Sequence, residues 1–522
     1  MSDLTYPIGT ATFGKIRRNG WFYVDKTDFI PKLLSEGQYL FLSRPRRFGK
    51  SLLVSTLEAY FHGEASLFSG LRIDETEKEW ITYPVLHLDL SQDDMTKHES
   101  LISYLDTMFT IWEREYAVDI KAVTPGTRFL QIIRYAKQRS GRDVVILIDE
   151  YDNPLFSTMA RPEENVKMRE TLKGIYSVLK AQSANIKFCF LTGITRFSKM
   201  SVFSGLNNLR DITLNPRFSG ICGITQKELE ENCREGVRNV ADNLAITYTE
   251  ALTKLKEQYD GYHFGDMNLD VYNPFSLIQA LADGKLLDYW FVSGTSQFLW
   301  ERISNLSIHE SLSEVLDPVL NVSDLGATED DGLSLPGLLF QTGYLTLKRE
   351  YEGNNYRLGI PNKEVETGIM RRLLPMAAKQ SAPAINAEIF RLRDLADKAD
   401  IDAFMKVLKS FMASIPYRLS ENKREVYFQN NLFIILSLVG LECREEVQTS
   451  YSRMDLFMRT TNYIYVIEVK LNRTARQALE QIKKKEYDLP FERHNLPIVR
   501  LGINFSTRTR NISTWAYDIT GA

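Results

Sequence analysis

A Gly-Lys-Ser tripeptide close to the N-terminus is the first group of residues that could do chemistry. It ends the stretch SRPRRFGKS (43–51), which follows an apolar, strand-like segment and precedes a segment with helical spacing of apolar residues. Backbone N–H groups at the start of a helix, together with a lysine, form a cradle for phosphate, and the hydroxyl after the lysine can ligate Mg²⁺. The residues expected to bind a nucleotide in this way are Arg46, Arg47, Phe48, Gly49, Lys50 and Ser51, with Ser51 as the Mg²⁺ ligand.

The match to the general phosphate-loop pattern GxxxxGK[ST] is degenerate, because its first position is Arg44 rather than glycine. From the tripeptide alone, a surface turn with a basic flank is an equal alternative. A pair of carboxylates favours phosphate binding, since the apolar run VVILIDE (144–150) ends in Asp149 and Glu150. We expect Asp149 to hold Mg²⁺ through water and Glu150 to polarise the attacking water. The alternative is a solvated strand end whose carboxylates cap a helix.

Three further residues near this site have an equally good structural explanation. Thr192 ends the next apolar strand and is placed to sense the γ-phosphate, although a strand-end hydroxyl bonded within the sheet is just as common. Arg196 and Arg217 could stabilise the charge of a transferred phosphate, but nothing in the sequence separates them from surface arginines.

A second group of chemical residues lies near the C-terminus. Glu468 and Lys470 are two apart on the strand-like YIYVIEVKL (463–471), so their side chains share one face. If residues 460–462 form a hairpin turn, strand pairing brings Asp455 within about one residue of Glu468. Two carboxylates can hold Mg²⁺, which lowers the pKa of bound water, and a lysine can orient that water and neutralise charge on the phosphate. These residue types suit phosphodiester hydrolysis. The alternative is a purely structural role, in which Glu468 and Lys470 form a salt bridge at the edge of a strand.

A basic helix is expected directly after this group. Its cations could face the phosphate backbone of a nucleic acid, although a solvated helix face is the more frequent explanation. The cations of this helix (476–485) are Arg476, Lys483, Lys484 and Lys485.

The elements that position the first group are strands that are apolar along their whole length and separated by helices. This pattern predicts an α/β domain with a parallel sheet covered on both faces. Between about 220 and 375, helices alternate with short strand-like pieces and a hairpin-like segment (344–360), which predicts a helical lid and a winged-helix-like connector. From about 385 helices dominate, and the chain then alternates strand, strand, helix and strand.

Composition excludes several classes of protein. The 522 residues predict about three domains at roughly 150 residues each. With 64 Lys plus Arg against 67 Asp plus Glu, the chain is not a strongly basic protein that coats nucleic acid. The four cysteines (189, 222, 233 and 443) are too scattered for a zinc ribbon or disulfide framework. The longest apolar run, LFIILSLVGL (432–441), is too short for a membrane span and predicts a buried helix. Because the N-terminus also lacks a signal peptide, we expect a cytoplasmic protein without membrane contact.

Several ordered motifs resemble the AAA-ATPase-like family, a group of bacterial P-loop proteins that usually carry a PD-(D/E)XK nuclease-like domain at the C-terminus. The resemblance covers about residues 5–280, and in that family too the first Walker A glycine is replaced within RPRRFGKS. The motifs are SRPRRFGKS, YVDKT (23–27), LIDEYDNPL (147–155), LTGITRFSK (191–199), FSGLNNLRDITL (203–214) and YDGYHF (259–264).

The C-terminal region resembles the PD-(D/E)XK nuclease-like domain itself, from a helix glutamate through the hairpin to a Gln-x-x-x-Lys-x-Tyr helix. One departure is Ser452, where that family usually has the glycine of Gly-Arg-x-Asp; Arg453, Met454 and Asp455 follow it. The carboxylates survive this change, so we expect an intact metal site. The resemblance implies a metal or structural role for Glu425, metal ligation by Asp455 and Glu468, catalysis by Lys470, and a place on the terminal helix motif for Gln481, Lys485 and Tyr487.

Together these features predict a P-loop NTPase parallel sheet with a helical lid and winged-helix-like connector, followed by a restriction-endonuclease-like α/β domain. The expected boundaries are 1–220, 221–375 and 376–522. The leading functional hypothesis is an ATP-binding, ATP-hydrolysing protein whose Mg²⁺-dependent nuclease domain cleaves nucleic acid, DNA rather than RNA, under nucleotide control. The alternative is a nucleotide-dependent switch or scaffold with a silent nuclease-like domain. A nucleotide kinase ranks last, since no acceptor site is evident, and assembly into a homo-oligomer is left open.

Overall fold

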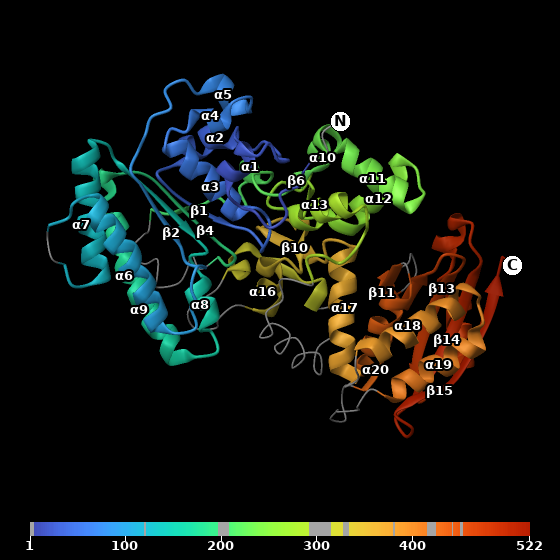
Figure 1. Ribbon diagram of the computed structural model, residues 1–522. Coiled ribbons are helices and arrows are strands. Elements are labelled where there is room, and N and C mark those ends of the chain that lie inside the picture. Colours follow the sequence, from blue (N-terminus) through green and yellow to red (C-terminus); the bar gives the residue numbers. More distant parts are fainter. Residues whose placement is uncertain are drawn as a thin grey trace. The chain divides into compact units, whose positions relative to one another are not determined.

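The computed structural model describes residues 5–119, 122–196, 208–291, 315–326, 334–378, 382–414, 424–440, 442–448 and 453–521. The chain divides into two compact units (Figure 1). The first unit is made of residues 1–294 and 317–364, and the second of residues 295–316 and 365–522.

A five-stranded sheet of parallel strands forms the centre of the first unit. Its order is β2-β3-β4-β1-β5, and every neighbouring pair is parallel. All residues of β1 and β3 are buried, as expected for strands covered on both faces. The prediction of an α/β domain with a parallel sheet is therefore confirmed. The strands are β1 (Tyr39–Ser43), β2 (Val85–Asp89), β3 (Val144–Asp149), β4 (Ile186–Gly193) and β5 (Arg210–Asp211).

Helices connect and cover these strands. Helix α3 contacts β2 and β3, while α6, α7 and α9 pack on one another and form a separate group in Figure 1. These helices are α1 (Phe13–Arg18), α2 (Phe29–Glu36), α3 (Lys50–Phe61), α4 (Ala65–Phe68), α5 (Arg72–Thr76), α6 (His98–Glu115), α7 (Pro125–Ser140), α8 (Asn153–Ser157) and α9 (Pro162–Ala181).

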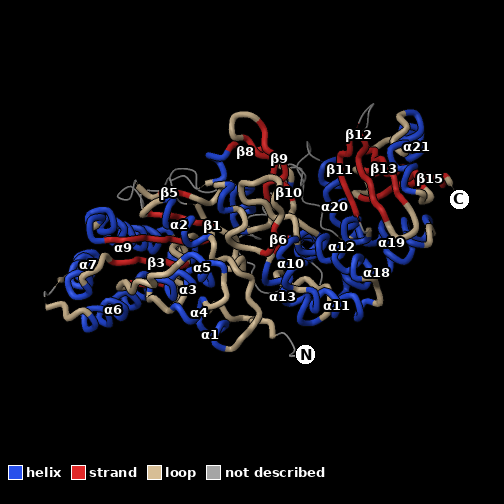
Figure 2. The backbone as a smooth tube through the Cα atoms, turned by 90° about the horizontal axis from the view of Figure 1, so that it is seen from above, coloured by secondary structure: helices blue, strands red, loops and turns tan. Residues whose placement is uncertain are grey.

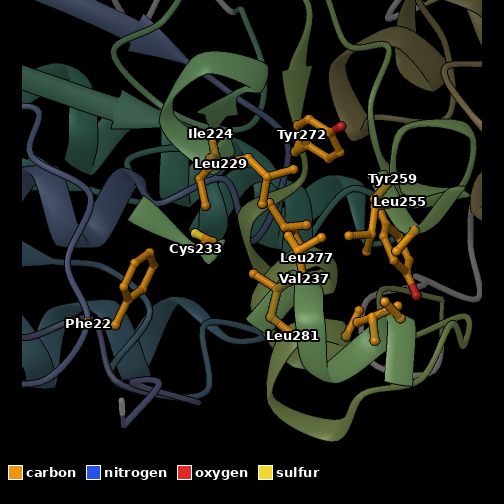
Figure 3. Close-up of a cluster of buried hydrophobic side chains, with 14 residues drawn as sticks. Phe22, Ile224, Leu229, Cys233, Val237, Leu255, Tyr259, Tyr272, Leu277 and Leu281 are labelled. Carbon is orange, nitrogen blue, oxygen red and sulfur yellow. The ribbon is translucent and has the colours of Figure 1, made fainter. Parts of the chain in front are cut away.

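A helical lid follows the sheet, as predicted. Its apolar core joins the faces of four helices and includes Phe22 from the N-terminal segment (Figure 3). The lid is made of α10 (Gln226–Asn232), α11 (Arg234–Leu244), α12 (Tyr248–Tyr259), α13 (Pro274–Asp283) and the short strands β6 (Ile224–Thr225) and β7 (Val271–Tyr272).

A small sheet completes the first unit. Helix α16 (Leu335–Thr342) leads into the hairpin of β9 (Thr346–Tyr351) and β10 (Asn355–Gly359), and β8 (Val319–Asn321) pairs with β10. A helix followed by a hairpin is the arrangement expected of a winged-helix-like connector. Helix α17 (Lys363–Ala378) starts at the end of this unit and continues into the second.

The second unit contains a mixed sheet (Figure 2). Its order is β11-β12-β13-β14-β15, and only β13 and β14 are parallel. The last strand was not predicted from the sequence. The strands are β11 (Glu442–Gln448), β12 (Arg453–Arg459), β13 (Ile464–Leu471), β14 (Ile498–Ser506) and β15 (Asn511–Thr520). The helices are α18 (Ala382–Asp397), α19 (Ile401–Ala413), α20 (Arg424–Val439) and α21 (Ala475–Lys484).

Helices cover both faces of this sheet. The Tyr465 hydroxyl donates to the Ala396 carbonyl of α18 at 2.7 Å, which places α18 on the face of the odd-numbered residues of β13. On the opposite face, Val466 shares a core cluster with Ile482 of α21. The predicted buried helix around 432–441 is confirmed as part of α20. None of the described helices has the length and apolar character needed to cross a membrane.

Candidate functional site

The loop between β1 and α3 has the backbone shape of a phosphate cradle. Arg47 has φ 67° and Gly49 has φ 91°, so the chain turns sharply through the left-handed region just before α3 begins at Lys50. Gly49 has no side chain that could cap the helix, and the first N–H groups of α3 are therefore not used by a cap. These N–H groups and the helix dipole favour an anion at this position.

Lys50 joins this loop to the carboxylates at the end of β3. Its side chain is 3% exposed, and its ammonium lies 3.2 Å from Glu150 Oε1 and 3.4 Å from the carbonyl oxygen of Pro45. The structure thus brings together Lys50 and Glu150, which the sequence placed 100 residues apart.

Asp149 lies next to these residues on β3. It is buried, and burial together with the charge of the neighbouring Glu150 raises its pKa to about 6, while a hydrogen bond from Ser51 and the charge of Lys50 oppose the shift. The hydroxyl and the carboxylate expected to share Mg²⁺ therefore lie close together. Both carry the hard oxygen atoms that this ion prefers.

Asp152, which the sequence analysis did not select, connects the ends of β3 and β4. Its carboxylate accepts hydrogen bonds from the backbone N–H of Ile194 at 3.1 Å and of Thr195 at 2.6 Å, and from the Thr195 hydroxyl. Burial raises the pKa of Asp152 to about 6. All of these contacts are internal, so Asp152 holds the strand ends in place and is a supporting residue of the site.

The three secondary candidates have structural partners. The Thr192 hydroxyl is buried and donates to the carbonyl oxygen of Leu42 at 2.8 Å. Arg196 forms an ion pair with Asp211 at 2.7 Å, and Arg217 forms one with Glu36 at 2.7 Å. These contacts match the structural alternative that the sequence left open for each residue.

Arg44, at the degenerate position of the loop, is a fully buried structural residue. Its guanidinium donates to the carbonyl oxygens of Ser43 and Thr213 at 2.8 Å and of Phe218 at 3.0 Å. It also lies 4.1 Å from the ring centre of Phe264, a cation–π contact. Burial lowers the pKa of Arg44 to about 10. Arginine therefore replaces glycine because it ties the loop to the lid.

Aromatic residues of the YDGYHF motif pack directly on the loop. The Phe48 ring lies 4.8 Å from that of Tyr262 and 5.4 Å from that of Phe264, both edge to face. The Arg47 guanidinium lies 3.9 Å over the ring of Phe275 at the start of α13. The indole N–H of Trp290 donates to the carbonyl oxygen of Arg46 at 3.3 Å.

An apolar pocket adjoins the N-terminus of α3. Its walls come from the loop and α3, from the N-terminal segment and from the lid. Residues that line it include Phe48, Leu52, Leu53, Val24, Ile224 and Ile278.

The C-terminal group assembles on the hairpin of β12 and β13. The register Leu456 to Ile467 sets Asp455 opposite Glu468, as expected from the turn at 460–462. An oxygen of Asp455 accepts the backbone N–H of Val469 at 2.7 Å, and the Lys470 ammonium lies 2.6 Å from Glu468 Oε1.

Glu468 is the central residue of this group. It is 2% exposed, and burial, with the nearby Asp455, raises its pKa to about 7, while Lys470 opposes the shift. Gln481 of α21 donates to Oε1, and the same amide contacts the Tyr487 hydroxyl at 3.2 Å. The other oxygen, Oε2, is buried without a hydrogen-bond partner among the described residues. An unpaired buried carboxylate oxygen beside a second carboxylate fits a metal ligand.

The described part of the structure gives no contact with Glu468 for the other C-terminal candidates. Lys485 is exposed at the end of α21. Glu425 belongs to α20, but its side chain is outside the described residues, as is Ser452. Among the described residues, no group of three His, Cys, Asp or Glu side chains could hold a metal ion. The site therefore offers two carboxylates, Asp455 and Glu468.

Comparison with known proteins finds a family match for each of the two regions that contain these residues. Residues 7–203 match the family described as "Predicted AAA-ATPase", and residues 423–515 match the PD-(D/E)XK nuclease superfamily. A protein of Azotobacter chroococcum mcd 1, described as an uncharacterized protein in the vnfD 5' region, is 32% identical over 533 residues that span both chains completely. The chain belongs to the AAA-ATPase-like family. The resemblance found in its motifs is thereby confirmed, together with the nuclease-like C-terminal domain.

One residue beside the candidate site of the nuclease-like domain in this AAA-ATPase-like protein was not selected from the sequence. Gly502 on β14 is opposite Glu468 in the sheet, and α21 crosses directly over it. A methyl group on Gly502 would lie 2.7 Å from the backbone nitrogen of Leu479 and 2.9 Å from Cβ of Ala478. Glycine therefore allows α21 to approach closely enough for Gln481 to contact Glu468. A glycine inside an apolar strand is the signal that could have indicated it.

Proposed function

We propose that this protein binds and hydrolyses ATP with Mg²⁺ at the phosphate loop, and that its C-terminal domain is a Mg²⁺-dependent nuclease that cleaves DNA under nucleotide control. The nuclease assignment rests on the buried Oε2 of Glu468, which has no hydrogen-bond partner among the described residues and lies beside Asp455 and Lys470. The working domains are residues 1–220, 221–375 and 376–522, and the place of action is the cytoplasm.

At the first site, Lys50 and the N–H groups at the start of α3 bind the phosphates. Ser51 and Asp149 would hold Mg²⁺, which neutralises charge on the phosphates when bound. Glu150 orients a water molecule for attack and accepts its proton. Its 3.2 Å contact with Lys50 supports this role, since it keeps the base beside the lysine that binds phosphate.

The apolar pocket beside α3 supports a nucleoside triphosphate as the ligand. Its lining residues suit the flat face of a purine, and Phe48 and Gly49 belong to both the pocket and the loop. A base in this pocket would contact the N-terminal segment and the lid at once.

At the second site, Asp455 and Glu468 would hold Mg²⁺, which supplies an activated water when bound. Lys470 stabilises the negative charge that develops on the phosphate. Gln481 and Tyr487 hold Glu468 in place from α21. With a raised pKa, Glu468 binds metal best in its ionised form, at neutral pH or above.

Contacts around Trp290 support nucleotide control. The Trp290 indole holds the carbonyl oxygen of Arg46 in the loop, and its backbone N–H donates to Glu364 of α17 at 2.8 Å. Helix α17 begins in the first unit and continues into the second, which contains the nuclease-like domain. A movement of the loop that shifts Trp290 and Glu364 would therefore act on this helix. Control requires that these contacts differ between nucleotide states.

Cleavage assays on the full-length chain test this proposal. Plasmid and single-stranded DNA are incubated in Mg²⁺ with and without ATP, using wild type, Lys470→Ala and Lys50→Ala, with Lys484→Ala as an exposed lysine control. We expect Lys470→Ala to abolish cleavage, Lys50→Ala to remove its response to ATP, and Lys484→Ala to behave as wild type. If wild type cleaves neither DNA nor a matched RNA with ATP bound, the nuclease assignment fails and a nucleotide-dependent switch or scaffold becomes the better explanation.

A further inference from the structure

Two loops lie side by side at the edge of the second sheet where Lys470 is found. Strands β13 and β14 are parallel, so the loop after β13 (472–474) and the turn after β14 (507–510) leave the sheet at the same edge. Together with the first turn of α21, these loops present four arginines, all exposed. We call Arg473, Arg476, Arg508 and Arg510 the arginine rim.

The two loops are fixed to each other by two asparagines. The side-chain oxygen of Asn472 accepts the backbone N–H of Thr507 at 2.9 Å and its hydroxyl at 3.1 Å. The side-chain oxygen of Asn504 accepts the backbone N–H of Arg473 at 2.8 Å. The arginine rim is therefore held on an ordered part of the sheet.

The arginine rim is close to the residues of the nuclease site. Lys470 pairs in register with Asn504, the same residue that binds the backbone of Arg473. Three residues of extended chain span about 10 Å, which is the largest separation of the backbones of Lys470 and Arg473. The same distance covers about three nucleotides along the axis of a DNA duplex, at about 3.4 Å for each nucleotide of one strand.

Few acidic residues occur in the sequence around the arginine rim. No Asp or Glu occurs in residues 469–479 or 495–517. Within the described part of the chain, the guanidinium groups of Arg473, Arg476 and Arg508 form no ion pair or hydrogen bond. By contrast, Arg500 in the same sheet pairs with the buried Asp488, as a structural arginine does.

The lysines at the other end of α21 have a different environment. Lys483 pairs with Asp518, and Asp518 is opposite Arg500 near the start of β14. These lysines therefore lie toward the far edge of the sheet from Lys470, with Glu480 and Glu486 as sequence neighbours. Of the helix cations singled out in the sequence, only Arg476 belongs to the arginine rim.

We propose that the arginine rim binds the phosphate backbone of the DNA substrate and guides the strand into the nuclease site. This proposal rests on the proposed nuclease function and adds the surface that holds the substrate. Guanidinium groups form paired hydrogen bonds with phosphate oxygens, and cations that contact the phosphates of DNA release its counterions on binding.

Binding of a fluorescein-labelled DNA duplex to the full-length protein, followed by anisotropy in EDTA, tests this proposal. The double variant Arg473→Ala/Arg508→Ala is compared with Lys398→Ala/Lys484→Ala, which loses the same charge from exposed positions of the same unit. We expect the arginine variant to raise the Kd about tenfold and to reduce the slope of log Kd against log salt by about 1.8, at 0.9 for each phosphate contact. The lysine variant should change the Kd by less than about twofold.

Further variants and substrates separate the outcomes. Arg473→Lys/Arg508→Lys should recover most of the affinity, since it restores the charge. If wild type and the arginine variant bind DNA with equal affinity, or if the lysine variant loses as much affinity as the arginine variant, the arginine rim is not the DNA-binding surface. The nuclease assignment still holds in either case, provided that wild type cleaves DNA. If wild type neither binds nor cleaves DNA, both the proposed DNA-binding surface and the nuclease assignment are wrong. A larger loss on a matched RNA duplex than on DNA would overturn DNA as the occupant.

Discussion

The ammonium of Lys50 and the carboxylate of Glu150 are 3.2 Å apart, although a whole strand, β4, lies between β1 and β3, the strands that precede them in the chain. Glu150 reaches this position with φ 48°, a left-handed conformation that is costly for a residue with a side chain. Strain of this kind is about 1–3 kcal/mol and persists where surrounding contacts enforce it. The position of Glu150 is thus set by its contacts rather than by its own preference.

Glu150→Gln should separate nucleotide binding from hydrolysis. The amide keeps the shape of the side chain but cannot accept the proton of water, so we expect ATP hydrolysis to fall by about 10²–10⁴-fold. ATP affinity should stay within a few-fold of wild type. Phosphate release and binding of a fluorescent ATP analogue measure the two effects, and Glu163→Gln on the exposed start of α9 is the control. If Glu150→Gln hydrolyses ATP at the rate of wild type, Glu150 is not the general base.

Arg44→Gly restores the general phosphate-loop pattern but should destabilise the protein. It removes hydrogen bonds to three carbonyl oxygens and the contact with the Phe264 ring. We expect the free energy of unfolding of the first unit to fall by about 2–4 kcal/mol. The midpoint of urea unfolding measures this, with Arg142→Gly, at an exposed turn, as the matched control. A midpoint equal to that of wild type would contradict the structural role.

Glu364→Gln should make stability less dependent on pH. Burial raises the pKa of Glu364 to about 8, so between about 4.5 and 8 the folded protein holds a proton that the unfolded chain has lost. The carboxyl group therefore lowers the free energy of unfolding as the pH rises through this window. Glutamine still accepts from the Ser276 hydroxyl at 3.0 Å and from the Trp290 N–H without titrating.

We expect the Tm of Glu364→Gln to exceed that of wild type by an amount that grows from pH 5 to pH 8.5, at about 2–4 °C for each kcal/mol. Thermal unfolding followed by circular dichroism measures this difference. Glu352→Gln, in the exposed turn between β9 and β10, serves as the control. A difference in Tm that stays constant with pH would contradict the assigned protonation.

Gly502→Ala should impair the nuclease and spare the ATPase. The added methyl group forces α21 away from β14, which separates Gln481 from Glu468. We expect DNA cleavage to fall at least about tenfold, since small displacements of positioning residues are costly. ATP hydrolysis should be unchanged. Gly174→Ala, in α9 with open space around the new methyl group, should leave both activities unaltered.

The parallel sheet was predictable because its strands are apolar along their whole length. Two strands lack this signal and were missed. Strand β5 contains only Arg210–Asp211 and pairs with β1 at the edge of the sheet. Strand β15 is half-exposed and carries polar residues on both faces, so its sequence has neither a continuous nor an alternating apolar pattern.

The candidate sites were predictable where sequence spacing fixes geometry. A hairpin turn sets the register, and this brought Asp455 to Glu468. Contacts between distant segments carry no such signal. Lys26 of the YVDKT motif forms an ion pair with Glu228 at 2.7 Å, 202 residues further along the chain, and only the folded lid creates that partner.

The position of β1 in the sheet has a consequence for how the protein is made. This strand leaves the ribosome early, yet its neighbours in the sheet are β4 and β5. At ordinary rates of synthesis, residue 186 emerges on the order of ten seconds after Ser43. Until then the phosphate loop and its lysine have no sheet to hold them. The proposed ATP site therefore forms late during synthesis, and a ribosome stalled before β4 would release a fragment in which this site is incomplete.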